Sequence, residues 1–261
     1  MRRLTSHTTH LVAAMAVTAA AVLTAFAMPL PAHAVTINLF SGNGSTISGS
    51  GKEVAISRPV SAFSVLRLDG SIDVRAHQGT TPSITVHADD NIEPLIETAV
   101  EGDKLIVRMR KGAGFSTRHD VFVDVVFTSL TAVQQRGSGD LHIDRISGPK
   151  FESSISGSGD LQIDNAQLGQ FALSIAGSGD VILSGSADEA RFGVAGSGDI
   201  NARNFAAKKV SVSISGSGDA HVNATEVLEA KVAGSGDVTY SGHPRDVSRR
   251  VSGSGSVEAS N

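Results

Sequence analysis

Hydrophobic and polar residues alternate along most of the chain after residue 52, with the period of two that a half-buried β-strand requires. In the first half of the chain this pattern predicts strands at residues 53–57, 63–68, 72–76, 83–88, 104–110 and 121–127. Glycine or proline separates these segments, as is typical of strand boundaries. One helical turn is predicted within residues 92–99. Because no window carries a clear helical period, the alternation predicts an all-β protein.

The second half of the chain is a tandem repeat. The tetrapeptide Gly-Ser-Gly-Asp occurs six times, and a seventh copy ends in serine, with 18 to 20 residues from one copy to the next. The paired glycines of the six copies are Gly137, Gly139, Gly157, Gly159, Gly177, Gly179, Gly196, Gly198, Gly216, Gly218, Gly234 and Gly236. Alternating apolar residues flank every copy. Each repeat is therefore predicted to be a strand, a tight corner, a second strand and a variable connection such as residues 165–170.

The length of the repeat selects the architecture. A propeller blade needs about 40 residues and four strands, which is twice what each repeat offers. In a solenoid, equivalent residues stack on one another, so every coil needs the same corner. Glycine lets the chain turn sharply at no steric cost, so the paired glycines are predicted to form the corners of the coils. The sequence therefore predicts a parallel β-helix, or β-solenoid, of about 20-residue coils with an irregular β-rich N-terminal cap.

The corner aspartates are the main candidates for chemistry. Stacking would place six of them in one column: Asp140, Asp160, Asp180, Asp199, Asp219 and Asp237. The preferred interpretation is structural, because an aspartate side chain can accept a hydrogen bond from backbone that a turn leaves unpaired. The alternative is a calcium ladder. Like charges about 5 Å apart repel, and a hard cation bound by the carboxylates would relieve that repulsion.

The pattern also predicts the domain organisation. Residues 1–34 are predicted to be a signal peptide, because two arginines precede an apolar run and an Ala-x-Ala site ends at Ala34. Residues 35–60 are predicted to be a flexible leader or first edge segment. Residues 61–256 are predicted to form one solenoid domain, with the cap and irregular coils at 61–136 and the repeats at 137–256, and residues 257–261 are predicted to be a tail. The protein is thus expected to be exported to the periplasm, the cell surface or the medium, without a membrane span after cleavage.

Composition narrows the function further. The chain contains no cysteine, which excludes disulfides, thiol nucleophiles and cysteine-based metal centres. A net charge of −4 and an aromatic content of 4% argue against nucleic-acid binding. The six histidines beyond the leader are scattered in sequence and are expected to be surface residues. No residue set resembles a catalytic constellation or a cofactor motif, so neither catalytic residues nor a cofactor are predicted.

Three stretches carry a resemblance to a known family. They are residues 63–70 (FSVLRLDG), residues 88–92 (ADDNI) and the tandem Ser-Gly-Ser-Gly-Asp strands. Over roughly residues 61–240 the chain resembles the auto-transporter adhesin, head GIN domain family of bacteria. That resemblance implies an exported β-helical domain of a family that is described as adhesins and has no assigned catalytic residues.

These observations favour a non-enzymatic binding module of the cell envelope that recognises a surface glycan or a protein. One alternative is a polysaccharide hydrolase or lyase, because parallel β-helices host many such enzymes. The absence of tryptophan and the single tyrosine argue against it, since a sugar-binding groove then lacks stacking platforms. Another alternative is a structural protein that forms homo-oligomers through its open solenoid edges.

Overall fold

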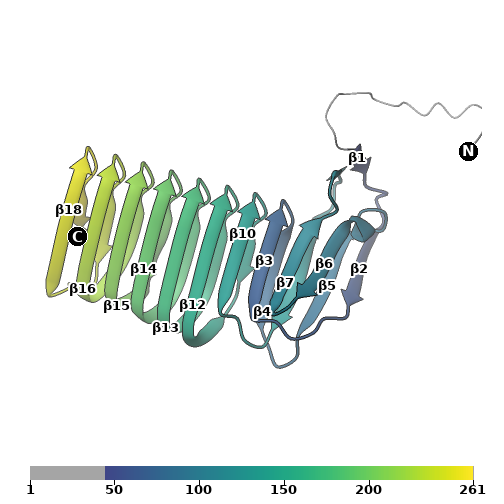
Figure 1. The fold of residues 1–261 in the computed structure, drawn as a ribbon, viewed down its shortest axis with the longest axis horizontal. Helices are drawn as coiled ribbons and strands as arrows, with labels where there is room; N and C mark the ends of the chain where they lie inside the picture. Colours follow the sequence, from purple (N-terminus) through teal and green to yellow (C-terminus); the bar gives the residue numbers. More distant parts are fainter. Residues whose placement is uncertain (1–44, 261) are drawn as a thin grey trace, which may run out of the picture. The chain divides into compact units, whose positions relative to one another are not determined.

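The computed structural model describes residues 45–260, which fold into β-strands linked by short corners (Figure 1). The predicted signal peptide and residues 35–44 of the predicted leader lie outside the described residues. The strands are β1 (Ser45–Ser48), β2 (Glu53–Arg58), β3 (Val65–Gly70), β4 (Asp73–Gln78), β5 (Ser83–Asp89), β6 (Ile96–Glu101), β7 (Lys104–Met109), β8 (Ala113–Ser116), β9 (Phe122–Phe127), β10 (Ala132–Gly137), β11 (Leu141–Ile143), β12 (Ile146–Gly157), β13 (Leu161–Gly177), β14 (Val181–Gly196), β15 (Ile200–Gly216), β16 (Ala220–Gly234), β17 (Val238–Ser241), β18 (Asp246–Gly253) and β19 (Val257–Ala259). A single 3₁₀ turn, η1 (Glu93–Leu95), precedes β6. Among these residues, no helix has the length and apolar character needed to cross a membrane.

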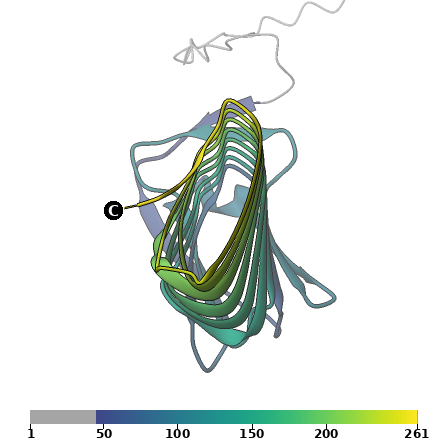
Figure 2. The same ribbon diagram turned by 90° about the vertical axis from the view of Figure 1, so that its left-hand side faces the viewer.

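From residue 132 onward the strands form a parallel β-solenoid, which confirms the prediction from the repeat. Consecutive coils pair in register, so that Gly157 lies beside Gly137 and Gly177 lies beside Gly157. Each coil rises by one interstrand spacing, about 4.8 Å. Figure 2 shows the coils superposed along the solenoid axis.

The predicted connection at residues 165–170 is part of a strand. Ala166, Gln167 and Leu168 pair with Ile146, Ser147 and Gly148 of the preceding coil, and β13 continues from one corner to the next. Ala166 and Leu168 point into the core, which is why this side of the coil also stays extended. Register shifts close to this bend, such as the one between Ile163 and Ala166, absorb the differences in repeat length.

The core runs continuously through the interior of the coils. Buried residues alternate with exposed ones along most of β12–β16, and four phenylalanines from successive coils pack with ring centroids 5.6 to 6.0 Å apart: Phe151, Phe171, Phe192 and Phe205. Two polar residues interrupt this core. The Gln135 amide donates to the carbonyl oxygens of Gly139 and Asp160, while its Oε1 has no partner, and the Ser153 hydroxyl has none either.

The corner requires both of its glycines. Gly157 has a φ of +138°, which side chains rarely adopt, and a Cβ there would lie 2.1 Å from the Gly137 carbonyl oxygen. A Cβ on Gly159 would lie 2.3 Å from the Gly139 carbonyl oxygen. The backbones of successive corners therefore approach too closely for any larger residue.

A mixed, curled sheet precedes the solenoid, as expected of an irregular cap. Strands β3 and β4 form a first coil on which β10 and β11 stack in parallel, with Gly70 beside Gly137. Residues 79–131 are inserted between these two coils. Their strands β7 and β9 pair in parallel with β3 and β4, and β2, β5 and β6 extend the sheet in antiparallel fashion.

Three expectations need correction. Residues 45–48 of the predicted leader form strand β1, which pairs with β8, whereas β2 at residues 53–58 agrees with the strand predicted at residues 53–57. Residues 257–259 of the predicted tail form β19, which pairs with β17 and buries Val257. The predicted helical turn is limited to η1, because Ile96 is buried at the start of β6 and that strand pairs along β7.

Candidate functional site

The corner aspartates form a continuous hydrogen-bonded column. The backbone N–H of Asp160 donates to Oδ1 of Asp140 at 2.8 Å, and the next four corners repeat this bond at 2.7 to 2.9 Å. Asp73 of the first coil begins the column by accepting from Asp140, and Ser256 ends it by donating to Asp237. Each carboxylate thus satisfies a backbone N–H of the next coil, which is the structural role that the sequence indicates.

The calcium ladder finds no support in this geometry. Within residues 45–260, no group of three or more histidine, aspartate or glutamate side chains is arranged to hold a metal ion. Burial raises the pKa of the Asp73 carboxyl, and the neighbouring charge of Asp140 adds to the rise, whereas the hydrogen bond from the Asp140 backbone opposes it. Each carboxylate of the column is therefore bonded to a backbone donor of the next coil.

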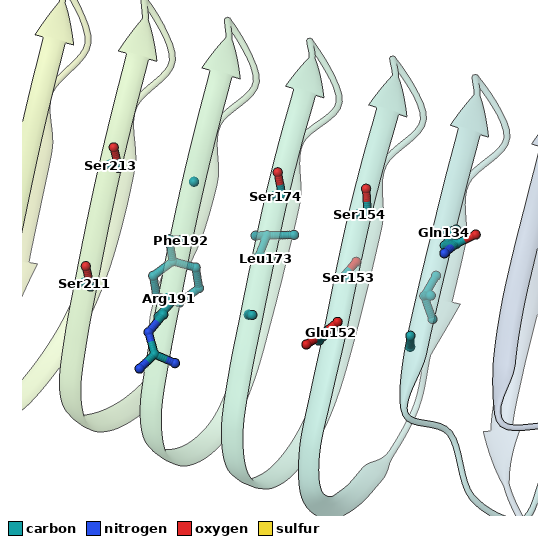
Figure 3. A pocket seen from close by; sticks show the side chains of 14 residues that line it. Gln134, Glu152, Ser153, Ser154, Leu173, Ser174, Arg191, Phe192, Ser211 and Ser213 are labelled. Carbon is teal, nitrogen blue, oxygen red and sulfur yellow. The ribbon is translucent and has the colours of Figure 1, made fainter.

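A flat, serine-rich surface covers one side of the solenoid. We call it the serine face, and define it by the outward residues of β10 and of the segments in register with it, residues 152–156, 172–176, 191–195 and 211–215. Their register aligns side chains, most of them small, in rows across the coils: Gln134, Ser154, Ser174, Gly193 and Ser213 in one row, and Ala132, Glu152, Ala172, Arg191 and Ser211 in the next. Figure 3 shows these hydroxyls above adjacent strands.

The serine face contains a shallow groove of about 460 Å³. Its floor is low because Ala172 and Gly193 carry little or no side chain, and Glu152 and Arg191 stand on strands at either side of Ala172 (Figure 3). Both charged residues are exposed, and among the described residues each pairs only with a neighbour on its own strand, Glu152 with Lys150 at 2.6 Å and Arg191 with Glu189 at 3.2 Å. Exposed pairs of this kind are weak, so both charges can exchange partners.

The histidines are less scattered than the sequence suggests. Asp124 on β9 lies 3.0 Å from Nε2 of His87 on β5 and 3.9 Å from Nε2 of His77 on β4. His77 Nδ1 also lies 3.3 Å from Asp144. These residues meet because β4, β5 and β9 are neighbours in the sheet although they are distant in the chain.

An aromatic ring next to this group is covered on both sides. Phe122 stacks against the His87 ring with centroids 4.4 Å apart, and the Arg75 guanidinium lies 3.7 Å from the Phe122 centroid. With both faces occupied, Phe122 offers no free surface for a sugar ring.

A second hollow, of about 590 Å³, surrounds a buried carboxylate in the N-terminal cap. Asp89 is fully buried, accepts from the Thr117 hydroxyl at 2.6 Å and lies 2.5 Å from Nδ1 of His119. Those two bonds hold the pKa of Asp89 below its usual range, and the bond to Asp89 raises the pKa of His119. Gly49 fits directly over Asp89, since a Cβ there would lie 1.8 Å from Oδ2. This pair joins the end of β5 to the segment that follows β8, the strand with which β1 pairs.

Sequence reasoning found the aspartate column but missed the groove and the Asp89 pair. Alternation of serine with buried residues on residues 153–156 and 211–215 was the available signal for the serine face. The Asp89 and His119 pair left no local signal, because the two residues are 30 positions apart.

The fold and its surfaces define an all-β solenoid domain with a capped N-terminal end and an exposed, hydroxyl-rich lateral face. The chain belongs to the family described as "Putative auto-transporter adhesin, head GIN domain", whose model matches residues 62–244. Comparison with curated proteins gives no match.

Solved structures are similar over most of the chain. A "putative adhesin" from Bacteroides fragilis is 27% identical with a TM-score of 0.77, and the match covers 82% of this chain and 100% of that one. A "putative lipid binding protein" from Parabacteroides distasonis is also 27% identical with a TM-score of 0.70, covering 83% and 100%. A "putative adhesin" from the same species is 25% identical with a TM-score of 0.67, covering 83% and 100%.

Proposed function

We propose that this chain is an exported, non-enzymatic binding module of the adhesin type, and that its serine face recognises an extended polar polymer at a cell surface, either a glycan or a protein. The observation that carries the proposal is the groove across consecutive coils, with a floor of small side chains and with Glu152 and Arg191 beside it. Membership of the adhesin family and the predicted signal peptide both support export.

The physical basis for binding is pre-organisation. The groove lies on paired strands, so its backbone is already ordered and little conformational entropy is lost when a ligand docks. Serine hydroxyls both donate and accept hydrogen bonds, and their side chains are short. Successive coils repeat these groups at about 4.8 Å, which suits a ligand that is itself extended and repetitive.

Charge adds direction to this surface. Glu152 and Arg191 lie on β12 and β14, with β13 between them, so opposite charges flank the groove about 10 Å apart. A polymer that crosses the coils would meet a carboxylate at one point and a guanidinium at the next. Such complementarity favours one orientation of the ligand and one register over others.

The alternative of a polysaccharide enzyme has less support. A hydrolase of the common type needs a carboxylic acid and a carboxylate held on either side of a substrate groove. Among the residues lining the groove, Glu152 is the only carboxylate, and Arg191 rather than a second acid stands across from it. A binding surface accounts for this arrangement better than a catalytic one does.

A glycan and matrix-protein array tests the proposal. We expect the wild-type protein to bind a defined subset of ligands. Ser174→Arg, which fills the groove, should weaken that binding about tenfold or more, equivalent to roughly 1.4 kcal/mol. Asn201→Arg places the same side chain on an exposed position of β15 outside the groove, and should bind like wild type.

Two results would contradict the proposal. One is release of reducing sugar from pectins or glucans by the wild-type protein, which would favour the enzyme. The other is equal binding by wild type, Ser174→Arg and Asn201→Arg, which would remove the serine face from recognition. Vesicles of zwitterionic and anionic lipid belong on the same panel, because one relative is described as a lipid binding protein.

A further inference from the structure

Both ends of the solenoid expose strand edges. Among the described strands, β18 pairs only with β16 and β19 only with β17 at the C-terminal end. At the N-terminal end, β2 pairs only with β5 and β6 only with β7. Figure 1 shows β18 and β2 at opposite ends of the row of coils. Unpaired edges of this kind are templates for pairing with another chain.

Apolar side chains are exposed at both ends. Val247 and Val251 on β18 are 37% and 42% exposed, although their register partners Leu228 and Val232 are buried in the core. Ile56 on β2 is 43% exposed, although it is paired with the buried Val86. These three residues are core-facing positions of the outermost strands, and no further coil covers them within residues 45–260.

The two ends carry opposite charge. Residues 89–103, which include η1 and β6, contain six carboxylates and no lysine or arginine. Three of these carboxylates pair with basic residues outside this segment, namely Asp90 with Lys52, Glu93 with Arg58 and Glu97 with Arg108, so the negative charge without an ion pair is smaller than the count. Residues 245–251 of the last coil contain three arginines and one aspartate. Neither Arg245 nor Arg250 forms an ion pair with any described residue, and the same is true of Glu53 and Glu101 at the other end.

Arg249 makes the C-terminal end selective. It is aligned with the buried Ala230, and its side chain lies across the end of the core, where it donates to the Tyr240 hydroxyl and the Val257 carbonyl oxygen. A charge at an inward-facing edge position discourages pairing with an apolar strand or with a second basic end. A docking partner must therefore bring carboxylates as well as apolar contacts.

We propose that copies of this chain associate end to end, with the β18–β19 end of one solenoid docked on the β2–β6 end of the next. The contact joins exposed valines to Ile56 and arginines to carboxylates, and it extends the paired strands from one copy into another. Two different surfaces of the chain meet, so the association does not close on itself and longer rows form as concentration rises. This inference is independent of the ligand that the serine face binds.

Three matched substitutions test the proposal by sedimentation velocity, from about 1 µM to 1 mM protein. Val251→Lys blocks one end and Ile56→Lys blocks the other. Ile182→Lys is the control, since Ile182 is 49% exposed on the side of the solenoid. We expect wild type and Ile182→Lys to form larger species as concentration rises, and each end variant alone to raise the dissociation constant by roughly tenfold or more. Circular dichroism should show the same fold in all four proteins, because every substituted side chain is exposed.

An equimolar mixture of the two end variants gives the sharpest result. Each variant retains one intact end, and these ends are complementary, so the mixture should form a one-to-one dimer and nothing larger. A wild-type protein that stays monomeric over the whole range would overturn the proposal. So would self-association of Ile56→Lys as strong as that of wild type, which would indicate pairing between two C-terminal ends, and so would a mixture that remains monomeric.

Discussion

Substitution of a corner glycine in the middle of the solenoid should be far more harmful than substitution of a glycine on its face. Gly177 has a φ of +150°, and a Cβ there would lie 2.0 Å from the Gly157 carbonyl oxygen. Gly193 has no such conformation, and its added Cβ would meet only the Leu173 carbonyl oxygen, at 3.6 Å. The two positions lie 16 residues apart on neighbouring coils, so they share the same core.

The cost of Gly177→Ala has two parts. A backbone conformation that only glycine adopts readily costs other residues about 1 to 3 kcal/mol. The two corners must also move apart to relieve the clash between the added Cβ and the Gly157 carbonyl oxygen. This movement weakens the hydrogen bond from the Ser178 N–H to that oxygen, which is 3.0 Å long in the wild type, and costs about 1 kcal/mol more. The expected loss is therefore about 2 to 4 kcal/mol, out of a total stability of roughly 5 to 15 kcal/mol. Gly193→Ala should change the stability by less than about 1 kcal/mol, because alanine also restricts the unfolded chain.

Urea unfolding followed by far-ultraviolet circular dichroism measures both values, since the chain contains no tryptophan and one tyrosine. A free energy of unfolding for Gly177→Ala within about 0.5 kcal/mol of the wild-type value would refute the proposed role of corner geometry. Equal destabilisation by Gly193→Ala would refute it as well, because the effect would then not depend on corner geometry.

Three further predictions concern polar groups. Asp180→Ala should lower the free energy of unfolding by about 1 kcal/mol, because the Asp199 N–H loses its acceptor. Asp180→Asn keeps an acceptor oxygen, so its free energy of unfolding should stay close to that of wild type. Calcium should not raise the melting temperature of the wild type above that of a control at matched ionic strength. Gln135→Ile should stabilise the protein by about 1 kcal/mol in the same urea assay, because it removes a buried oxygen without a partner, and a loss of stability would show that the two bonds donated by the amide matter more. The bond to Asp89 raises the pKa of His119, so this ion pair stabilises the fold at acidic pH, down to the lowered pKa of Asp89. That stabilisation is lost as the pH rises through the raised pKa of His119. The melting temperature of the wild type should therefore fall between pH 5 and pH 8, and that of His119→Gln should fall less.

The repeat made the solenoid predictable, because stacking imposes the same corner on every coil. The spacing of the glycines set the coil length, and alternation around them identified the inward residues, such as Ile155 and Ile175. The aspartate column followed from the same register, since a residue that recurs at one corner position must lie beside its equivalents.

Long-range pairing was not predictable in the same way. Gly70 and Gly137 belong to adjacent coils, but the insertion at residues 79–131 separates them in the sequence. The only sequence feature that indicated their pairing is the similarity of residues 69–74 to the later corners. The meeting of His77 and His87 at Asp124 depends on strand order in the curled sheet, which alternation does not encode. The groove likewise depends on which small residues become neighbours across coils.

The central claim is that the corners hold the solenoid together and that the serine face does the binding. The most direct test compares the affinity of wild type, Asp180→Asn and Ser174→Arg for a ligand found on the array. We predict that Asp180→Asn binds like wild type and that Ser174→Arg loses about tenfold or more in affinity. Loss of binding in Asp180→Asn together with full binding in Ser174→Arg would contradict the claim and place recognition on the aspartate column.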